Sequence, residues 1–153
     1  DRFTEGLMVV VKSKLAYQSL TDQFREKQVK KYYYAMLKGN LINDELDVDQ
    51  PIGRHTKQRH KYCVQDHGKP SLSRFSVIKR YNSMTLCNVA LITGRTHQIR
   101  VHAHYIGHPL IGDHIYSKGD GQLLQSFYLS FFHPRLKLRM SFEIPMMNRM
   151  VKT

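Results

Sequence analysis

Near the start of the chain, hydrophobic residues form first a continuous run and then a series at helical spacing. Residues 7–11 are apolar and rich in β-branched side chains, which predicts a buried strand. Ser13 follows as a favourable helix N-cap. After it, Tyr17, Leu20 and Phe24 fall on one face of a helix, with charged residues elsewhere. We therefore expect a surface helix whose face with these three side chains packs on a sheet.

Three later segments have the composition and alternation of strands. Residues 29–37 form a tyrosine-rich run, and residues 72–80 and 84–92 are two further extended segments. The turn-like sequence Tyr-Asn-Ser at 81–83 separates the last two. We expect these two segments to pair as antiparallel strands.

The stretch between the first and second of these strands lacks clear periodicity. Gly39 begins a polar, acidic segment that runs through Asp49 and reads as a loop. Residues 51–69 are rich in Lys, Arg, His and Gly. We expect them to form a loop that is either mobile or becomes ordered on a partner such as RNA.

The C-terminal half adds one helix and two strands to the prediction. Residues 96–106 are consistent with a short helix closed by Gly107, and residues 128–132 and 136–144 alternate like half-buried strands. The chain has 153 residues, a normal length for one domain. Strands mixed irregularly with few helices predict an α+β fold, with a mixed, mainly antiparallel β-sheet and a few flanking helices.

The charge balance points to a polyanionic partner. The sequence has 24 Lys and Arg against 12 Asp and Glu, a net charge of +12. A surplus of this size builds a positive field that attracts nucleic acid. Composition alone leaves two other interpretations open, namely contact with an anionic membrane surface and a basic surface that only maintains solubility.

Cysteine content and hydropathy indicate the cellular compartment in which the protein works. Cys63 and Cys87 are too few to indicate a disulfide framework or a zinc site, which is typical of a reducing compartment. No apolar stretch approaches the ~20 residues of a membrane span, and no signal-peptide pattern opens the chain. We expect a cytoplasmic protein that does not enter a membrane.

The densest chemical signal is the segment Thr-Gly-Arg-Thr-His-Gln-Ile-Arg-Val-His at 93–102. It presents Arg95, His97 and Arg100 after a glycine at a strand-to-helix junction, where donors can bind phosphate or an acidic side chain. A solvated polar helix is the competing interpretation. Metal binding by the closely spaced histidines is a weaker one, because no nearby Cys or carboxylate pattern completes a ligand set.

Several motifs in this order resemble the RluA-type pseudouridine synthase family. Residues 94–102, followed by Gly-His-Pro-Leu-Ile-Gly-Asp at 107–113, look like its long signature block. The opening Asp-Arg-Phe-Thr-Glu-Gly-Leu is similar to its nucleophile motif, and Val-Lys-Lys-Tyr-Tyr-Tyr-Ala at 29–35 to its tyrosine motif. The resemblance runs from the first residue to about Phe142 and implies the family's catalytic fold over residues 1–153.

The resemblance implies a catalytic role for three residues. Asp1 matches the family's nucleophile, Tyr33 the tyrosine that stacks on the target base, and Arg100 the arginine that pairs with the aspartate. A neighbouring cation favours the ionised carboxylate, which is the reactive form. Stacking of an extruded base on an aromatic ring stabilises its binding by about 1–3 kcal/mol.

Substrate contacts are implied for a second group. Arg2 matches a position that helps displace the flipped nucleotide, and Leu124 an apolar position that closes the pocket, although core packing explains Leu124 equally well. Arg95, His97 and Arg54 are expected to contact the RNA. Sequence-independent phosphate contacts are expected from Lys30, Lys31, Arg54, Lys57, Arg59 and Lys61.

The chain departs from the family pattern at a few positions. Leu-Gln-Ser at 124–126 stands where the family commonly has Leu-His-Ala, and Ser71 and Ser73 replace an Ala and a Thr. A His-Arg-Leu segment normally precedes the aspartate, often with a small RNA-binding domain further upstream. We therefore expect an incomplete chain whose missing part completes the sheet.

The expected function is isomerisation of specific uridines to pseudouridine in structured RNA, with ribosomal RNA favoured over transfer RNA. No cofactor and no metal are expected, and the oligomeric state is open. Two alternatives remain: a non-catalytic RNA-binding module with the same fold, and a histidine-based metal hydrolase.

Overall fold

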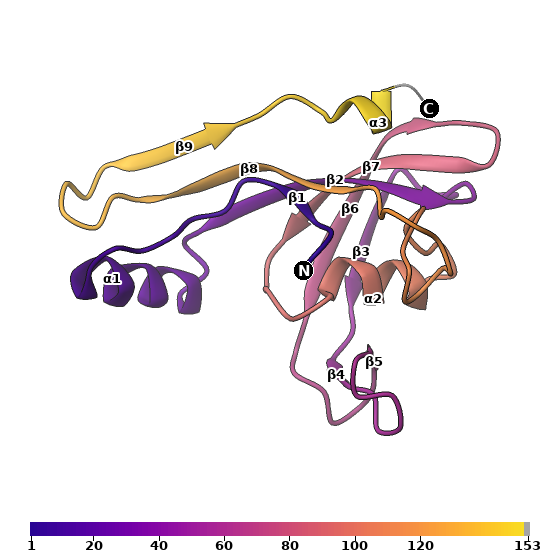
Figure 1. Cartoon of the computed structure of the whole chain (residues 1–153), viewed down its shortest axis with the longest axis horizontal. Helices are drawn as coiled ribbons and strands as arrows, with labels where there is room; N and C mark the ends of the chain where they lie inside the picture. The colour runs from indigo at the N-terminus through magenta and orange to yellow at the C-terminus, as the bar shows by residue number, and fades with distance from the viewer. Residues whose placement is uncertain (152–153) are drawn as a thin grey trace.

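The computed structural model describes residues 1–151 and shows one extended sheet with small elements on both faces (Figure 1). The long helix α1 (Lys14–Arg25) lies under one end of the sheet. Helix α2 (Gln98–Tyr105) lies under its middle, above a small hairpin of β4 (Ile52–Arg54) and β5 (Tyr62–Val64). The sheet therefore has one face that carries both main helices.

The main sheet has seven strands and is almost entirely antiparallel. Its order is β1-β8-β2-β7-β6-β3, with β9 also paired to β8. The bounds are β1 Glu5–Gly6, β2 Lys30–Lys38, β3 Glu45–Asp49, β6 Leu72–Arg80, β7 Met84–Leu91, β8 Leu124–Phe132 and β9 Arg139–Glu143. Among the strands of residues 1–151, β1 and β8 are the one pair that runs in parallel. The predicted α+β class with a mainly antiparallel sheet is confirmed.

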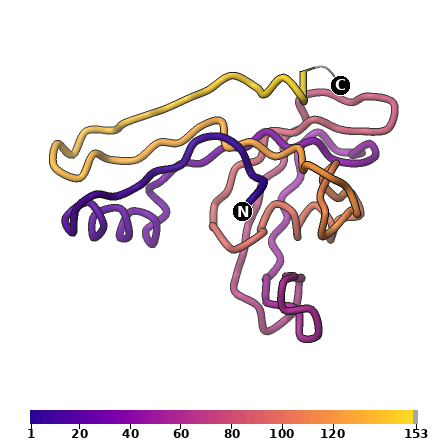
Figure 2. The backbone as a smooth tube through the Cα atoms, in the orientation of Figure 1, coloured from indigo at the N-terminus to yellow at the C-terminus, as the bar shows by residue number. Residues whose placement is uncertain are grey.

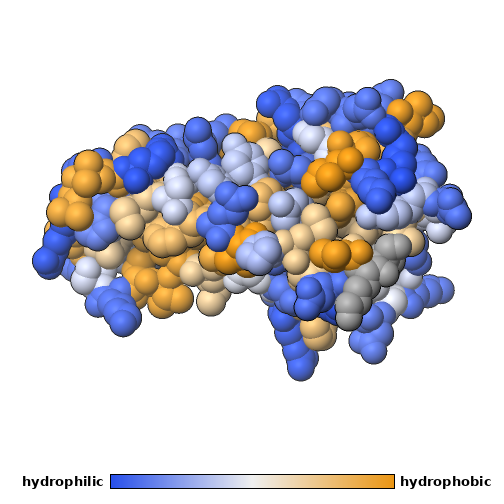
Figure 3. All heavy atoms as spheres, turned by 90° about the horizontal axis from the view of Figure 1, so that it is seen from above, coloured by the Kyte–Doolittle hydropathy of each residue, from blue (hydrophilic) through white to orange (hydrophobic). Residues whose placement is uncertain are grey.

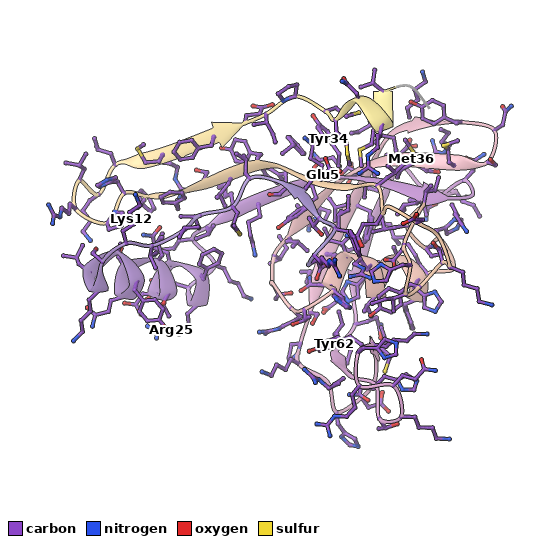
Figure 4. The ribbon with its side chains drawn as sticks, viewed as in Figure 1. Glu5, Lys12, Arg25, Tyr34, Met36 and Tyr62 are labelled. Atoms are coloured by element: carbon purple, nitrogen blue, oxygen red, sulfur yellow. The ribbon has the colours of Figure 1, made fainter. Side chains whose placement is uncertain are left out.

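Alternation along β2 divides the core between the two faces of the sheet. Ala35 and Leu37 point toward α2, where they pack with Phe75, Val89 and Ile99. Tyr34 and Met36 point to the other side, which carries the short helix α3 (Asn148–Val151), as Figure 4 shows. The predicted strand over residues 29–37 and the predicted antiparallel pair β6–β7 are confirmed within one residue at each end.

Helix α1 begins as predicted but packs through different side chains. Ser13 accepts a hydrogen bond from the backbone N–H of Ala16 at 3.2 Å, which is the expected N-cap. Leu20 is buried, whereas Tyr17 is 60% and Phe24 43% exposed. The second buried position is Gln23, whose amide group bonds to the backbone of β8. The predicted packing face is therefore wrong for Tyr17 and Phe24.

The predicted buried strand at residues 7–11 is also wrong. Only Glu5 and Gly6 form strand β1, and Met8 and Val10 are 82% and 70% exposed. Strand β1 approaches β8 so closely that a Cβ on Gly6 would lie 2.1 Å from the Ser126 carbonyl oxygen, at a φ of +104°. Glycine is required there, and beyond it the chain leaves the sheet toward α1 (Figure 2).

Two segments predicted as loops contain strands. The acidic segment after Gly39 ends in β3, which pairs with β6 at the edge of the sheet. Its carboxylates face outward, where Asp47 pairs with Arg74. Residues 51–69, predicted as a mobile or partner-dependent loop, include the β4–β5 hairpin. Short, polar strands of this kind lack the apolar periodicity that sequence patterns detect.

The C-terminal elements follow the prediction with shifted bounds. Helix α2 ends before Gly107, which has a φ of +81°, as the predicted closure requires. Strand β8 begins at Leu124, four residues before the predicted 128, and β9 is short and mostly exposed. Figure 3 shows apolar side chains at the end of the molecule formed by the β8–β9 hairpin, where Leu136 and Leu138 are exposed.

Candidate active site

The N-terminus of the chain lies beneath the sheet, beside α2 (Figures 1 and 2). Strand β1 fixes this position, because Glu5 and Gly6 pair with Gln125 and Ser126 of β8. The Asp1 side chain is 15% exposed. Its two oxygens face two cationic or polar nitrogens of the α2 region: Oδ2 lies 3.5 Å from Arg100 Nη1, and Oδ1 lies 3.4 Å from His97 Nε2.

Arg100 is held by a second, closer carboxylate. Its Nε and Nη2 atoms donate to Asp113 at 2.7 and 3.0 Å, and both side chains are buried. Asp113 also accepts from the backbone N–H groups of Ile115 and Tyr116. Burial alone would raise the pKa of the Asp113 carboxyl, but these donors, Arg100 first, bring it below its ordinary value. The ionised Asp113 thus fixes the guanidinium that faces Asp1.

His97 connects Asp1 to a partly buried tyrosine, Tyr116. The Tyr116 hydroxyl oxygen accepts from the backbone N–H of Tyr62, so its proton is free to point at His97 Nδ1, 3.0 Å away. The imidazole then carries its proton on Nε2, the atom that faces Asp1. Burial, followed by the charge of Arg100, lowers the pKa of His97 to about 4. His97 is therefore neutral at physiological pH.

The backbone at His97 is strained. His97 occupies the N-cap position of α2 with a φ of +56° and makes no side-chain cap hydrogen bond. A left-handed conformation at a residue other than glycine is uncommon and is enriched at functional sites. Here it turns the imidazole away from the helix end and toward Tyr116 and Asp1.

Asp1 opens onto a cavity of about 500 Å³ between the sheet and the start of α2. This volume lies within the range of small-ligand pockets. Tyr33 forms one wall, together with Leu124 and Ser126 of the neighbouring strand. Burial raises the pKa of the Tyr33 phenol, and a hydrogen bond with Ser126 partly offsets that effect. Tyr33 is thus a protonated aromatic wall of the cavity that holds Asp1.

The neighbouring tyrosines belong to the opposite face of the sheet. The ring of Tyr34 stacks on Phe127 at 3.8 Å between centroids, and Tyr32 also packs near Phe127, at 6.4 Å. The expected alternation along β2 is therefore confirmed, although a β-bulge shifts the register with β8 between Tyr32 and Tyr33. Only Tyr33 of the three lines the cavity.

The structure separates the expected substrate-contact residues into two groups. Arg95, His97 and Leu124 line the cavity with Asp1 and Tyr33. Arg2 and Arg54 do not: Arg2 lies over the ring of Phe3, and Arg54 lies on the β4–β5 hairpin. Figure 4 shows Tyr62, the residue to which Arg54 donates, on this hairpin. The roles assigned to all five residues remain predictions.

Two polar residues of the 93–102 segment, Gln98 and His102, attach α2 to neighbouring parts of the fold. The Gln98 amide accepts from the backbone N–H of Arg95 and donates to Ser73 on β6. His102 bonds to Ser73 and to the carbonyl of Gln50. Within residues 1–151 no group of three His, Cys, Asp or Glu side chains is placed to hold a metal ion. None of the helices in this range is long and apolar enough to cross a membrane.

Sequence reasoning missed the contribution of Tyr116. Tyr116 receives the hairpin N–H, contacts His97, and lies under the Arg100 guanidinium at 5.2 Å from the ring centroid. The available signal was its position three residues after Asp113, in the same block as the Gly-Asp of the resemblance. Asp113 itself ends that block, but no role was assigned to it from the sequence.

Most of the chain matches known pseudouridine synthases in sequence. The family model described as RNA pseudouridylate synthase matches residues 1–105. An "Uncharacterized RNA pseudouridine synthase" of Aquifex aeolicus is 38% identical over 94% of this chain and 50% of its own length. The "Ribosomal large subunit pseudouridine synthase D" of Pseudomonas aeruginosa is 37% identical over 95% of this chain and 51% of its own.

A solved structure, "Human RNA Pseudouridylate Synthase Domain Containing 1", has a TM-score of 0.76 at 28% identity and covers 87% of this chain and 61% of the human chain. The chain spans about half the length of the curated relatives that it matches. Because the family model covers more than half of its residues, the chain belongs to the RNA pseudouridylate synthase family, in which its motifs are those of the RluA type.

Proposed function

We propose that this chain is the catalytic part of an enzyme that isomerises specific uridines to pseudouridine in structured RNA, with ribosomal RNA as the favoured substrate. One observation carries the proposal. The Asp1 carboxylate lies 3.5 Å from a buried guanidinium, Arg100, on the wall of a cavity that Tyr33 also lines. The Arg100 charge favours the ionised, reactive form of the carboxylate.

The reaction must exchange one bond for another at a single ribose carbon. The bond from C1′ to N1 of uridine breaks, the base turns, and a bond from C1′ to C5 forms, while the C5 hydrogen leaves as a proton and N1 takes up a proton. No net oxidation occurs and no group is added. Asp1 acts as the nucleophile or base, and the chain needs no cofactor to balance the reaction.

The cavity supplies the positioning that this exchange requires. A base extruded from RNA enters between the Tyr33 ring and the apolar side chain of Leu124, which shields it from water. Arg100, itself fixed by Asp113, holds the Asp1 carboxylate in place during the attack. Holding reactants in register in this way accounts for a large part of enzymatic acceleration.

The test uses the full-length protein and Asp1→Asn, which keeps the side-chain volume and removes the charge. Uridine-containing ribosomal RNA labelled with tritium at C5 releases the label when the new bond forms. We expect release by the wild type, none by the variant, and RNA affinity of the variant within a few-fold of the wild type. Release by the variant at the wild-type rate would contradict the assignment of Asp1.

The same assay distinguishes a pseudouridine synthase from a non-catalytic RNA-binding module. If the wild type binds RNA and releases no tritium, the chain is a non-catalytic RNA-binding module with this fold. Transfer RNA labelled in the same way serves as the second substrate. Greater release from transfer RNA than from ribosomal RNA would reverse the proposed substrate preference.

A further inference from the structure

A second hollow adjoins the candidate active site and shares a wall with it. It has a volume of about 460 Å³ and lies between the end of α1 and the loop that follows β7. Phe24, Lys31, Gly94 and Arg95 line both this hollow and the cavity that contains Asp1. A ligand that occupies both hollows therefore passes these four residues.

Two cations on this wall lie close together without an anion between them. Lys31 lies on β2 two residues before Tyr33, so both side chains point to the same face of the sheet. Its ammonium is near the backbone of Gly94, where an added Cβ would be 2.9 Å from Nζ. Burial, and then the charge of Arg95, lowers the pKa of Lys31. Within residues 1–151 the Lys31 ammonium has no hydrogen bond and no ion pair, and it lies 5.5 Å from the centroid of the Phe24 ring.

Arg95 is anchored in a way that leaves its outer nitrogens available. Its backbone N–H donates to Gln98, and its Nε donates to the carbonyl of Pro70 at 3.2 Å. Neither terminal nitrogen of the guanidinium has a bond in the described part of the chain. The anchored stem therefore presents a fixed fork of donors beside Lys31, which is the geometry that recognises phosphate oxygens.

We infer that Lys31 and Arg95 form a phosphate-binding site for the RNA backbone next to the uridine that enters the active site. The inference rests on the proposed function and adds to it the location of one phosphate contact. A phosphodiester placed there would supply the anion that the two cations lack. Because the site adjoins the wall formed by Tyr33, it would fix the backbone of the flipped nucleotide rather than bind RNA at random.

The first experiment compares the full-length wild type with Lys31→Met and Arg95→Met for RNA affinity at several salt concentrations. Each variant should bind about tenfold more weakly at low salt, since charge-assisted bonds are strong. The slope of log affinity against log salt should become shallower by about 0.7 to 0.9 per lost phosphate contact. Lys30→Met, which removes the same charge from the adjacent, outward-facing position, measures the contribution of general electrostatics.

The deciding experiment is a double-substitution cycle with an RNA that the full-length protein converts. Single phosphates on either side of the target uridine are replaced by neutral methylphosphonate. At one position the replacement should weaken binding by the wild type about tenfold but leave binding by Lys31→Met or Arg95→Met almost unchanged, while Lys30→Met should lose as much as the wild type. Losses that add at every position would overturn the site.

The result is separable from the proposed function. If no RNA is converted, the proposed function fails, and the salt slopes on ribosomal RNA still decide whether Lys31 and Arg95 contact phosphate. If RNA is converted but the two variants behave like Lys30→Met, the site alone fails. A carboxylate elsewhere in the full-length protein that pairs with Lys31 would give this second outcome. Lys31→Met should melt no lower than the wild type, because it removes a partly buried charge, and this checks that the variant folds.

Discussion

Arg100 and Asp113 form a two-point ion pair, at 2.7 and 3.0 Å, in which neither side chain has appreciable contact with solvent. Removing one charge of such a pair leaves the other buried and uncompensated, which costs about 3–5 kcal/mol in proteins. We expect Asp113→Asn to lower the free energy of unfolding by about 3 kcal/mol. Because the same guanidinium faces Asp1, the variant should also lose most of its catalytic activity. Urea unfolding and the tritium-release assay measure the two effects.

Asp120→Asn is the matched control, since Asp120 is exposed in the same connection between α2 and β8. It should change neither quantity. Acid provides a second check: the pKa of Asp113 is lowered in the folded state, so its stabilising contribution is present above the ordinary carboxyl pKa and is lost as pH falls through the folded value. An Asp113→Asn protein as stable as the control would show that the pair does not hold the fold.

The neutral state of His97 predicts a specific loss of stability in mild acid. Its pKa in the folded protein is about 4, against an ordinary value of 6.5. Below pH 6.5 the unfolded chain takes up a proton that the folded site does not accept, so the contribution of His97 is complete above that pH and declines toward pH 4. Between pH 7 and pH 4 the wild type should therefore lose more stability than His97→Asn.

Urea unfolding at half-unit pH steps gives the two curves. The buried His102, whose pKa is also lowered by burial, contributes equally to both proteins and cancels in the difference. Parallel curves would mean that the pKa of His97 is the same in the folded and unfolded protein, so that the site does not hold the imidazole in its neutral form. A wild type that loses less stability than His97→Asn would mean a raised pKa, and the proposed donation from the Tyr116 hydroxyl to Nδ1 would then have to be abandoned.

Tyr116→Phe should affect catalysis more than it affects RNA binding. The change removes the hydroxyl that orients His97 and accepts the backbone N–H of Tyr62, but it keeps the ring beneath Arg100. We expect the rate of pseudouridine formation to fall about tenfold, with affinity for RNA reduced by a few-fold as the β4–β5 hairpin loosens. Single-turnover rates at saturating protein separate the two effects.

Tyr105→Phe is the control for this change, because Tyr105 at the end of α2 is exposed. If Tyr116→Phe shows the few-fold loss of RNA affinity but forms pseudouridine at the wild-type rate when saturated, Tyr116 acts only by anchoring the β4–β5 hairpin. Its link to His97 would then have no part in the reaction.

The central strands and the residues around the cavity could be predicted because each carries a local pattern. The alternation along β2 placed Tyr33 opposite its neighbours, and the Gly-Arg-Thr-His-Gln-Ile-Arg segment located α2. Their proximity to Asp1 came from the family resemblance, since no periodicity shows that residue 1 lies 3.5 Å from residue 100. The pairing of Arg100 with Asp113 and the role of Tyr116 depend on tertiary contacts that local patterns do not contain.

The failed predictions at residues 7–11 and on α1 have different physical causes. Residues 7–11 have strand composition, but beyond Leu7, whose N–H bonds to Ser126, the segment leaves the sheet in the described structure. Apolar composition favours a strand only when a neighbouring strand accepts its hydrogen bonds. The packing face of α1 was misjudged because a glutamine, Gln23, occupies a buried position where the pattern predicts an apolar side chain.

That glutamine gives a final prediction about how α1 is attached. The Gln23 amide donates to the carbonyl of Phe132 at 2.9 Å and accepts from its backbone N–H at 2.8 Å, so one side chain satisfies both backbone groups at the end of β8. Gln23→Leu keeps the volume but leaves both groups unpaired, which should lower the free energy of unfolding by about 2 kcal/mol. Gln18→Leu, on the exposed side of α1, should have little effect. Hydrogen exchange at the Phe132 amide should quicken in the first variant alone; equal exchange in both would show that the apolar contacts of Leu20 suffice to hold the helix.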